Sequence, residues 1–398
     1  MVNIAIMGLG VVGGGVAEIL RRNGEGIARK LGQTMELKTV LVRTLRDGPD
    51  REKMTTDFAD VESDPDIRVV VETMGGVGAA LDYTRRCLLA GKHVVTANKE
   101  LVAQHGRELL ALAQENGVNY LFEASVGGGI PILRPLTQCM AANEIEEVTG
   151  ILNGTTNYIL TRMVRAGASF ADALREAQEK GYAEADPTAD VAGIDACRKT
   201  CILGDLAFGR DIRPERVPTE GITALSLRDV QIAERGGYRV KLLGRALRLP
   251  GGGRTAYVAP HLVAEDSPLA GVEDVFNAIL VRGNATGEVM FYGKGAGAMP
   301  TASAVVADVM DALVHDQVPK DLGWDEDDGK FASPEGLVQR WYVRAAAEPG
   351  AVAAALGQAD ILLAQAGETA CLTPPLTQAE LTARTAELGV AARLRLLS

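Results

Sequence analysis

The chain has 398 residues, of which 47% are hydrophobic, and this length predicts two or three domains rather than one core. Its 41 basic and 52 acidic side chains give a formal net charge of -11, which argues against nucleic acid or a membrane surface and favours small-molecule partners. Five cysteines, an odd number, favour a reducing cytoplasm. Because no apolar run reaches about 18 residues, no membrane span is expected. Met1 leads directly into a strand pattern with no basic n-region or cleavage site, so no export signal is expected.

The chain opens with a strand, a glycine-rich turn and a helix. Residues 2–7 have the pattern of a short buried strand, and residues 16–22 have helical periodicity. The glycines between them permit a tight turn and a close approach of the backbone to a pyrophosphate at the helix N-terminus. A nicotinamide dinucleotide is therefore expected here, in contact with Gly8, Gly10, Val12 and Gly13.

Strands and helices then alternate along the first third of the chain. Further strands are expected at 37–42, 69–72, 93–96 and 120–123, with a helix at about 81–90. This alternation predicts a Rossmann-type, doubly wound parallel sheet whose ligands bind at the carboxyl ends of the strands.

Three polar residues follow these strand ends. Arg43 lies where an NAD-selective enzyme usually has an acidic residue, and it suits a 2′-phosphate, so NADP is favoured over NAD. Thr73 and Lys99 lie where a parallel sheet presents side chains to its ligand. An ammonium at Lys99 could meet a substrate oxygen near the nicotinamide, whereas a surface lysine capping a carbonyl is the alternative.

A run of glycines, Gly127-Gly-Gly129, marks a predicted hinge between two domains. Residues 1–130 form the expected dinucleotide-binding domain, and residues 131–300 form a second α/β domain for catalysis and dimerisation. A capped helix at about 301–316 could return to the first domain.

The rest of the chain predicts a linker and a small module. Residues 317–338 are acidic and poor in apolar side chains, as is typical of a linker. Residues 339–398 alternate between strand and helix patterns, with strands at 341–345 and 392–397 and a second helix at 378–388. This order predicts a small α/β module with a separate role.

A cluster of carboxylates and an ammonium lies inside the second domain. Asp195 and Lys199 are four residues apart, so they share a face if this stretch is helical. Gly193 would let a ligand approach the backbone closely. The lysine could gain and lose a proton in a carbonyl-to-alcohol reduction, and a solvated ion pair of little energetic weight is the alternative reading.

The segment from Ala177 to Lys199 resembles the signature segment of homoserine dehydrogenases. Supporting similarities lie at 150–158 and 295–304, and the resemblance extends from residue 2 to about residue 316. It implies the reversible reduction of L-aspartate 4-semialdehyde to L-homoserine with NAD(P)H, in the biosynthesis of threonine, methionine and isoleucine.

The resemblance also implies roles for individual residues. Lys199 is the expected proton donor to the nascent alkoxide, with Lys99 as a second proton carrier and Asp195 as the group that orients the lysine. Glu184 is expected to face the substrate amino group. Asp190, Tyr182 and Thr155 are expected at the substrate and Gly297 at the cofactor, although Tyr182 and Thr155 could instead be a core hydroxyl and a helix cap.

The stretch from Glu123 to Ile130 offers a carboxylate and bare backbone carbonyls, the ligands that a hard cation prefers. The sequence alone favours a hinge here. The resemblance implies a sodium or potassium ion with a structural role, held by Glu123 and by the carbonyls of Val126, Gly128 and Ile130.

The tail resembles a regulatory module of the ACT type through residues 341–350 and through its order of strands and helices. It is shortened around 358–362, which leaves open both feedback by threonine and a role in dimer packing. A homodimer or homotetramer is expected. The alternatives are a dehydrogenase of another small amino or hydroxy aldehyde and a non-catalytic protein that senses cofactor and amino acid.

Overall fold

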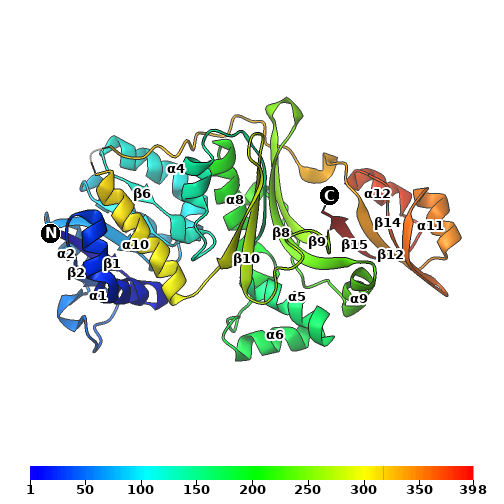
Figure 1. The fold of residues 1–398 in the computed structure, drawn as a ribbon, viewed down its shortest axis with the longest axis horizontal. Helices are drawn as coiled ribbons and strands as arrows, with labels where there is room; N and C mark the ends of the chain where they lie inside the picture. The colour runs from blue at the N-terminus through cyan, green and yellow to red at the C-terminus, as the bar shows by residue number, and fades with distance from the viewer. Residues whose placement is uncertain (317, 398) are drawn as a thin grey trace.

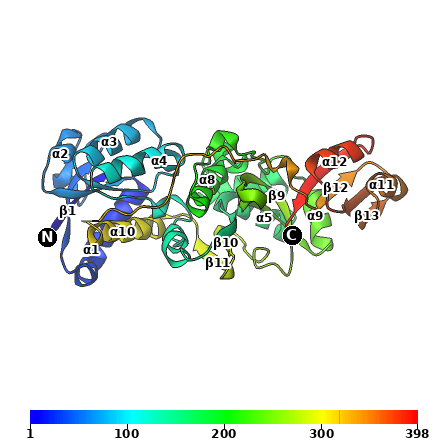
Figure 2. The ribbon, with the colours of Figure 1, turned by 90° about the horizontal axis from the view of Figure 1, so that it is seen from above.

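The computed structural model describes residues 1–316 and 318–397, and the chain forms three parts in a row. Figure 1 shows the N-terminal domain at one end, a large twisted sheet in the middle and the C-terminal module at the other end. The view from above in Figure 2 shows the same order, so the molecule is elongated.

The first domain contains a parallel sheet of six strands in the order β3-β2-β1-β4-β5-β6. The central strands β1, β4 and β5 are rich in Val and Ile and mostly buried, as expected when helices cover both faces of a parallel sheet. The order reverses between β1 and β4, and ligands bind at such a point. The strands are β1 Val2–Met7, β2 Met35–Leu41, β3 Met54–Thr55, β4 Ile67–Glu72, β5 His93–Thr96 and β6 Tyr120–Leu121.

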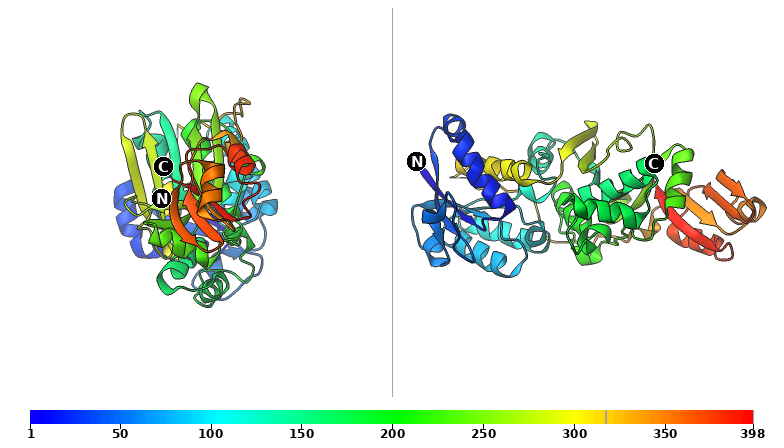
Figure 3. Two further views of the ribbon diagram at one scale, coloured as in Figure 1. Left: turned by 90° about the vertical axis from the view of Figure 1, so that its right-hand side faces the viewer. Right: turned by 90° about the horizontal axis from the view of Figure 1, so that it is seen from below.

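Helices cover both faces of this sheet because alternate strand residues point to opposite sides. Ile4 and Ile6 pack with α1 (Val11–Leu31) and α10 (Ala298–Val314), whereas Ala5 and Met7 face the other side. The second face is covered by α2 (Ala59–Glu62), α3 (Gly78–Leu89) and α4 (Lys99–Glu115). Figure 3 shows α10, far away in sequence, lying beside α1.

The second domain is built on five strands at one end of a nine-stranded sheet, from the edge strand β11 to β9, and the full order is β11-β10-β7-β8-β9-β15-β12-β14-β13. Helix α8 packs across β7, β8 and β9. The remaining elements of this domain are β7 Ile145–Ile151, β8 Tyr238–Arg248, β9 Arg254–Ala264, β10 Phe276–Gly283, β11 Gly287–Lys294, α5 Gly154–Ala166, α6 Phe170–Glu179, α7 Thr188–Val191, α8 Ile194–Phe208 and α9 Leu227–Arg235.

The C-terminal module has the strand and helix order βαββαβ, with antiparallel pairing in the order β15-β12-β14-β13. Its second helix ends at Arg384, earlier than expected, because the chain then turns so that Leu388 is buried and Gly389 adopts φ 63°. The elements are β12 Trp341–Ala345, α11 Pro349–Leu356, β13 Asp360–Gln365, β14 Glu368–Leu372, α12 Gln378–Arg384 and β15 Val390–Leu396.

The module is continuous with the second domain. Strand β15 pairs in parallel with β9, with Arg395 opposite His261, so both parts share one sheet. Arg344 of the module also forms a 2.6 Å ion pair with the buried Asp229 of α9. The α/β fold class expected from the sequence, with a doubly wound parallel sheet and further α/β parts, is confirmed.

Candidate active site

Lys199 and Asp195 lie on one face of α8, as their spacing predicts. The helix begins after Gly193, whose φ of 83° is a conformation that favours glycine. The Lys199 ammonium donates to Asp195 Oδ2 at 2.7 Å and to the backbone carbonyl of Leu152 at 2.8 Å. Both side chains are buried, so this is not a solvated surface pair.

Lys99 reaches the same carboxylate from the first domain. It is the first residue of α4, and its Nζ lies 2.6 Å from Asp195 Oδ1. The preceding residue, Asn98, caps α4 by accepting from Leu101 N–H and donates to the carbonyl of Gly76 at 2.6 Å. Asp195 therefore lies between two ammonium groups at the junction of the two domains.

The surroundings change the pKa values of the two lysines in opposite directions. Burial lowers the pKa of Lys199 below its ordinary value, and the attraction of Asp195 offsets only part of this effect. Burial also opposes the charge of Lys99, but the paired Asp195 outweighs it and raises the pKa of Lys99. Burial would raise the pKa of Asp195, yet the two ammonium groups hold it below its usual range. Pairs with divergent pKa values are typical of acid and base sites.

Asn153, which was not predicted as a site residue, connects the carboxylates of this site. Its Nδ2 donates to Asp190 Oδ1 at 2.7 Å and to Asp195 Oδ2 at 2.8 Å, while its Oδ1 caps α5 by accepting from Thr156 N–H. Burial raises the pKa of Asp190. Asn153 lies in the segment 150–158 that resembles homoserine dehydrogenases, and this was the only indication of its role in the sequence. Its contacts are with residues far away along the chain, so local patterns do not reveal them.

A cleft of about 920 Å³ lies at the carboxyl edge of the parallel sheet. Of the residues expected at the cofactor, it is lined by Gly8, Gly10, Arg43 and Thr73. A second guanidinium, that of Arg46, also lines the cleft. Arg46 was not predicted because it lies beyond the strand end, in the irregular segment after β2.

Two glycines of the turn at this cleft, Gly8 and Gly13, have no room for a side chain. A Cβ on Gly13 would lie 2.0 Å from the Gly8 carbonyl oxygen and 2.9 Å from Thr73 Oγ1. The Thr73 hydroxyl donates to Gly8 O at 2.7 Å and thereby holds the turn. Bare backbone at the start of α1 is what a pyrophosphate requires, so these residues fit a dinucleotide.

The other expected cofactor residues lie outside the lining of this cleft. Val12 packs against the core between the sheet and α1. Gly297 precedes α10 with φ 126°. Lys99 is held at Asp195, as described above.

The expected substrate residues are only partly brought together. Asp190 is linked to Asp195 through Asn153, whereas the Thr155 hydroxyl donates to the Tyr182 carbonyl at 2.6 Å. The Tyr182 side chain is exposed. Among the described residues, none forms a hydrogen bond or ion pair with the exposed Glu184 carboxylate.

The carboxylate and the three carbonyls that were expected to bind a cation have different hydrogen-bond partners. The Glu123 carboxylate accepts hydrogen bonds from the backbone N–H groups of Ile132, Leu133 and Arg134 at 2.6 to 2.8 Å. The carbonyls of Val126, Gly128 and Ile130 accept no hydrogen bond from residues that the structure describes. These three carbonyls are of the ligand type that a hard cation prefers, whereas the Glu123 carboxylate is already held by three backbone donors.

Within residues 1–316 and 318–397, no helix is both long and apolar enough to span a membrane.

Comparisons with known proteins match most of the chain. The family model for homoserine dehydrogenase matches residues 131–310, and that for the homoserine dehydrogenase NAD binding domain matches residues 8–123. A homoserine dehydrogenase of Synechocystis sp. is 48% identical over 320 residues, covering 78% of this chain and 73% of that protein. The chain belongs to the homoserine dehydrogenase family. The expected oxidoreductase is confirmed, and the sensing protein is not favoured.

Solved structures of homoserine dehydrogenases have the same fold. The crystal structure of a homoserine dehydrogenase from Thiobacillus denitrificans has a TM-score of 0.92 and 40% identity, and the match covers 100% of this chain and 98% of that one. A hyperthermophilic archaeal homoserine dehydrogenase in complex with NADPH has a TM-score of 0.67 and 29% identity, covering 79% and 98%. The match to the Thiobacillus denitrificans structure includes the C-terminal module.

Proposed function

We propose that the chain catalyses the reversible NAD(P)H-dependent reduction of L-aspartate 4-semialdehyde to L-homoserine, with Lys199 as the general acid and base. The observation that carries this proposal is the series Lys199, Asp195 and Lys99, with contacts of 2.7 and 2.6 Å. It lies where the domain with the dinucleotide cleft meets α8 of the second domain.

The Lys199 ammonium has the geometry of a proton donor. An ammonium carries three N–H groups, and two of those of Lys199 point to Asp195 and to the Leu152 carbonyl. The third is available to the aldehyde oxygen. When bound, the reduced nicotinamide supplies the hydride to the carbonyl carbon. Lys199 Nζ gives its proton to the oxygen as the C–O π bond breaks, and in the oxidation direction the neutral amine takes that proton back.

Lys99 has a supporting role in this proposal. Its pKa is raised by Asp195, so it remains charged when Lys199 changes its protonation state. A fixed positive charge beside the reacting oxygen stabilises the developing alkoxide. A role as second proton carrier, which the resemblance also implies, would require Lys99 to lose this proton against the attraction of Asp195.

The anionic groups around Lys199 suit an amino acid substrate. Asp190 lies beside Asp195 through their shared partner Asn153 and would accept the substrate ammonium, together with Glu184 from the exposed loop. Tyr182 and Thr155 border the same loop. Because these carboxylates can bind the ammonium group of the substrate, the site should prefer an aldehyde that carries an amino group over an aldehyde without one.

We also propose that NADP is preferred over NAD. Two guanidinium groups, Arg43 and Arg46, line the cleft, and a 2′-phosphate is best recognised by arginine. The NADPH complex of the archaeal homoserine dehydrogenase supports this preference. A sodium or potassium ion at the carbonyls of Val126, Gly128 and Ile130 would have a structural role.

A homodimer or homotetramer is supported by the exposed edge strand β11, where Met290 and Tyr292 present apolar surface. The βαββαβ order of the C-terminal module is compatible with a threonine effector. The oligomeric state is measured by light scattering, and the effect of threonine by adding it to the steady-state assay.

The proposed reaction is tested by following reduced nicotinamide absorbance with homoserine and each oxidised cofactor. Turnover of homoserine is expected, and Lys199→Ala should lower kcat by about 10²- to 10⁴-fold, the usual effect of losing a general acid or base. Binding of NADPH should be unchanged, because the cleft is lined by first-domain residues. A Lys199→Ala protein with normal kcat would exclude the mechanism.

A further inference from the structure

The segment from residue 318 to residue 338 contacts all three parts of the molecule. Figures 1 and 2 show it running from the first domain across the second domain to the module. At its start, Lys320 N–H donates to Asn119 of the first domain, and near its end Pro334–Gly336 packs against α12 of the module. We refer to residues 318–338 as the strap.

The indole of Trp324, in the strap, touches both domains of the active site. It packs so closely on α4 that a Cβ on Gly106 would lie 2.6 Å from its ring. It also forms an edge contact with Phe122, at 6.2 Å between ring centroids, and its Nε1 donates to Asp211 Oδ1 of the second domain at 3.2 Å. The side chain is buried.

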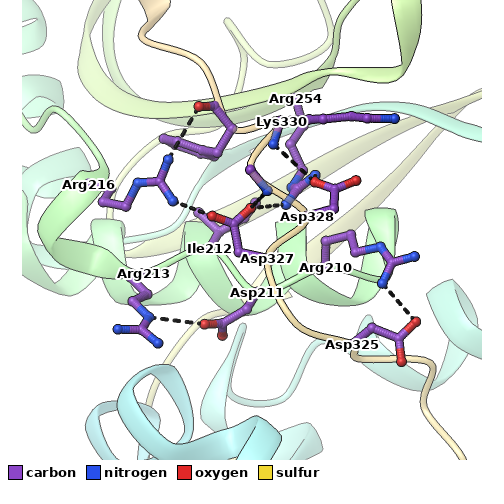
Figure 4. A network of polar contacts seen from close by, with 12 residues as sticks. Arg210, Asp211, Ile212, Arg213, Arg216, Arg254, Asp325, Asp327, Asp328 and Lys330 are labelled. Atoms are coloured by element: carbon purple, nitrogen blue, oxygen red, sulfur yellow. Dashed lines mark hydrogen bonds and ion pairs between the residues drawn. The ribbon is translucent and has the colours of Figure 1, made fainter.

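Ion pairs fix the next residues of the strap to the second domain, as Figure 4 shows. The buried guanidinium of Arg254 pairs with Asp328 at 2.6 Å and also with Asp327, which in turn contacts Arg216. Asp325 forms backbone hydrogen bonds with Gly209 and Asp211, just after α8 ends. The residues that follow Trp324 are therefore held to the second domain by backbone hydrogen bonds and by ion pairs.

The helix on which Trp324 packs is the helix that presents Lys99. Gly106 lies seven residues after Lys99, about two turns or 10 Å along α4. Near the active site, α4 and α8 are joined by Lys99 with Asp195 and by a 2.7 Å pair between Arg198 and Glu100. Trp324 contacts α4 further along and connects it to Asp211, beyond the end of α8.

We propose that Trp324 is a positioning residue, which holds α4 of the first domain against the second domain so that Lys99 stays at Asp195 and the dinucleotide cleft faces Lys199. This inference rests on the proposed function. The cleft is lined by first-domain residues alone and Lys199 belongs to the second, so loss of the contact changes the alignment between them. Affinity for the cofactor is unaffected.

The test compares Trp324→Ala, Trp324→Phe and Gly106→Ala with the wild-type enzyme. Because a misplacement of about 1 Å can cost roughly 100-fold in rate, Trp324→Ala should lower kcat by about 10- to 100-fold. The Kd for NADPH, measured by titration, should not change. Trp324→Phe keeps an aromatic ring against α4 and should restore most of kcat.

Gly106→Ala disturbs the same contact from the other side, and alanine is a better helix former than glycine, so α4 itself should remain folded. It should lower kcat as Trp324→Ala does, and it should shift tryptophan emission to longer wavelength as the indole leaves its buried position. In the double variant the added methyl has room, so it should cause no further loss. Glu335→Gln, which changes an exposed strap carboxylate in the turn that packs against α12 of the module, is the matched control and should behave like wild type.

Activity of the wild-type enzyme on homoserine tests the proposed function separately, and the emission shift of Gly106→Ala tests the contact without any activity. The inference is overturned if folded Trp324→Ala and Gly106→Ala keep wild-type kcat. It is also overturned if the Kd for NADPH rises in these variants, or if the two single losses simply add in the double variant.

Discussion

Replacing Asp195 by Asn removes the negative charge that lies between the two ammonium groups and leaves the side-chain size unchanged. Lys199 is buried, and Asp195 at 2.7 Å offsets part of the resulting fall in its pKa. An adjacent opposite charge typically shifts a pKa by about 1–3 units, so the pKa of Lys199 should fall by that amount in the variant. The nearby charge of Lys99, no longer compensated, acts in the same direction.

The direction in which the pH profile shifts follows from the role of Lys199. Oxidation of homoserine requires the neutral amine, so kcat/KM rises with pH through the pKa of Lys199. In Asp195→Asn this rise should move to lower pH by about 1–3 units, even if the maximum rate falls because Lys199 is less well oriented. In the reduction direction, which requires the ammonium, the fall in rate at high pH should move the same way.

The assay is kcat/KM for homoserine across the neutral and alkaline range at saturating oxidised cofactor. Asp186→Asn, which changes an exposed carboxylate before α7, is the control and should leave the profile in place. NADPH binding verifies that the first domain is intact. If the rising limb of Asp195→Asn coincides with that of the wild type, Lys199 is not the titrating group.

Two further predictions concern the cleft. Arg43→Ala and Arg46→Ala should each raise KM for NADPH by about tenfold or more, because each variant loses a charge-assisted hydrogen bond, while KM for NADH stays constant. Equal changes in KM for both cofactors in steady-state assays would contradict a 2′-phosphate site. Gly13→Ala should abolish NADPH binding because its Cβ would overlap the Gly8 carbonyl, whereas Gly14→Ala, which has open space around it, should bind normally in the same titration.

The features predicted best from the sequence are those encoded by neighbouring residues. The strand, glycine turn and helix at the start of the chain follow from local periodicity and from glycine conformations. The shared face of Asp195 and Lys199 follows from helical spacing alone. Arg43 could be placed because it lies just beyond the end of a strand, two residues after Leu41.

Features formed by distant segments could not be predicted in this way. The contact of Lys99 with Asp195 joins residues 96 positions apart, and Asn153 approaches Asp190 and Asp195 only once β7 and α8 have packed. The acidic composition of the strap suggested a solvated linker, yet its carboxylates pair with arginines of the second domain. Composition does not reveal which partner a charge will find.

The parallel pairing of β15 with β9 has a mechanical consequence. The module and the second domain belong to one sheet that runs from β11 to β13, and they are joined where Arg395 and Leu396 of β15 pair with His261 and Leu262 of β9. Glu220, which accepts from Arg395 of β15, also bonds to β9 through its own N–H. An effector bound at the module would therefore act on the second domain by elastic deformation of a single sheet, and not by docking and release of a tethered unit.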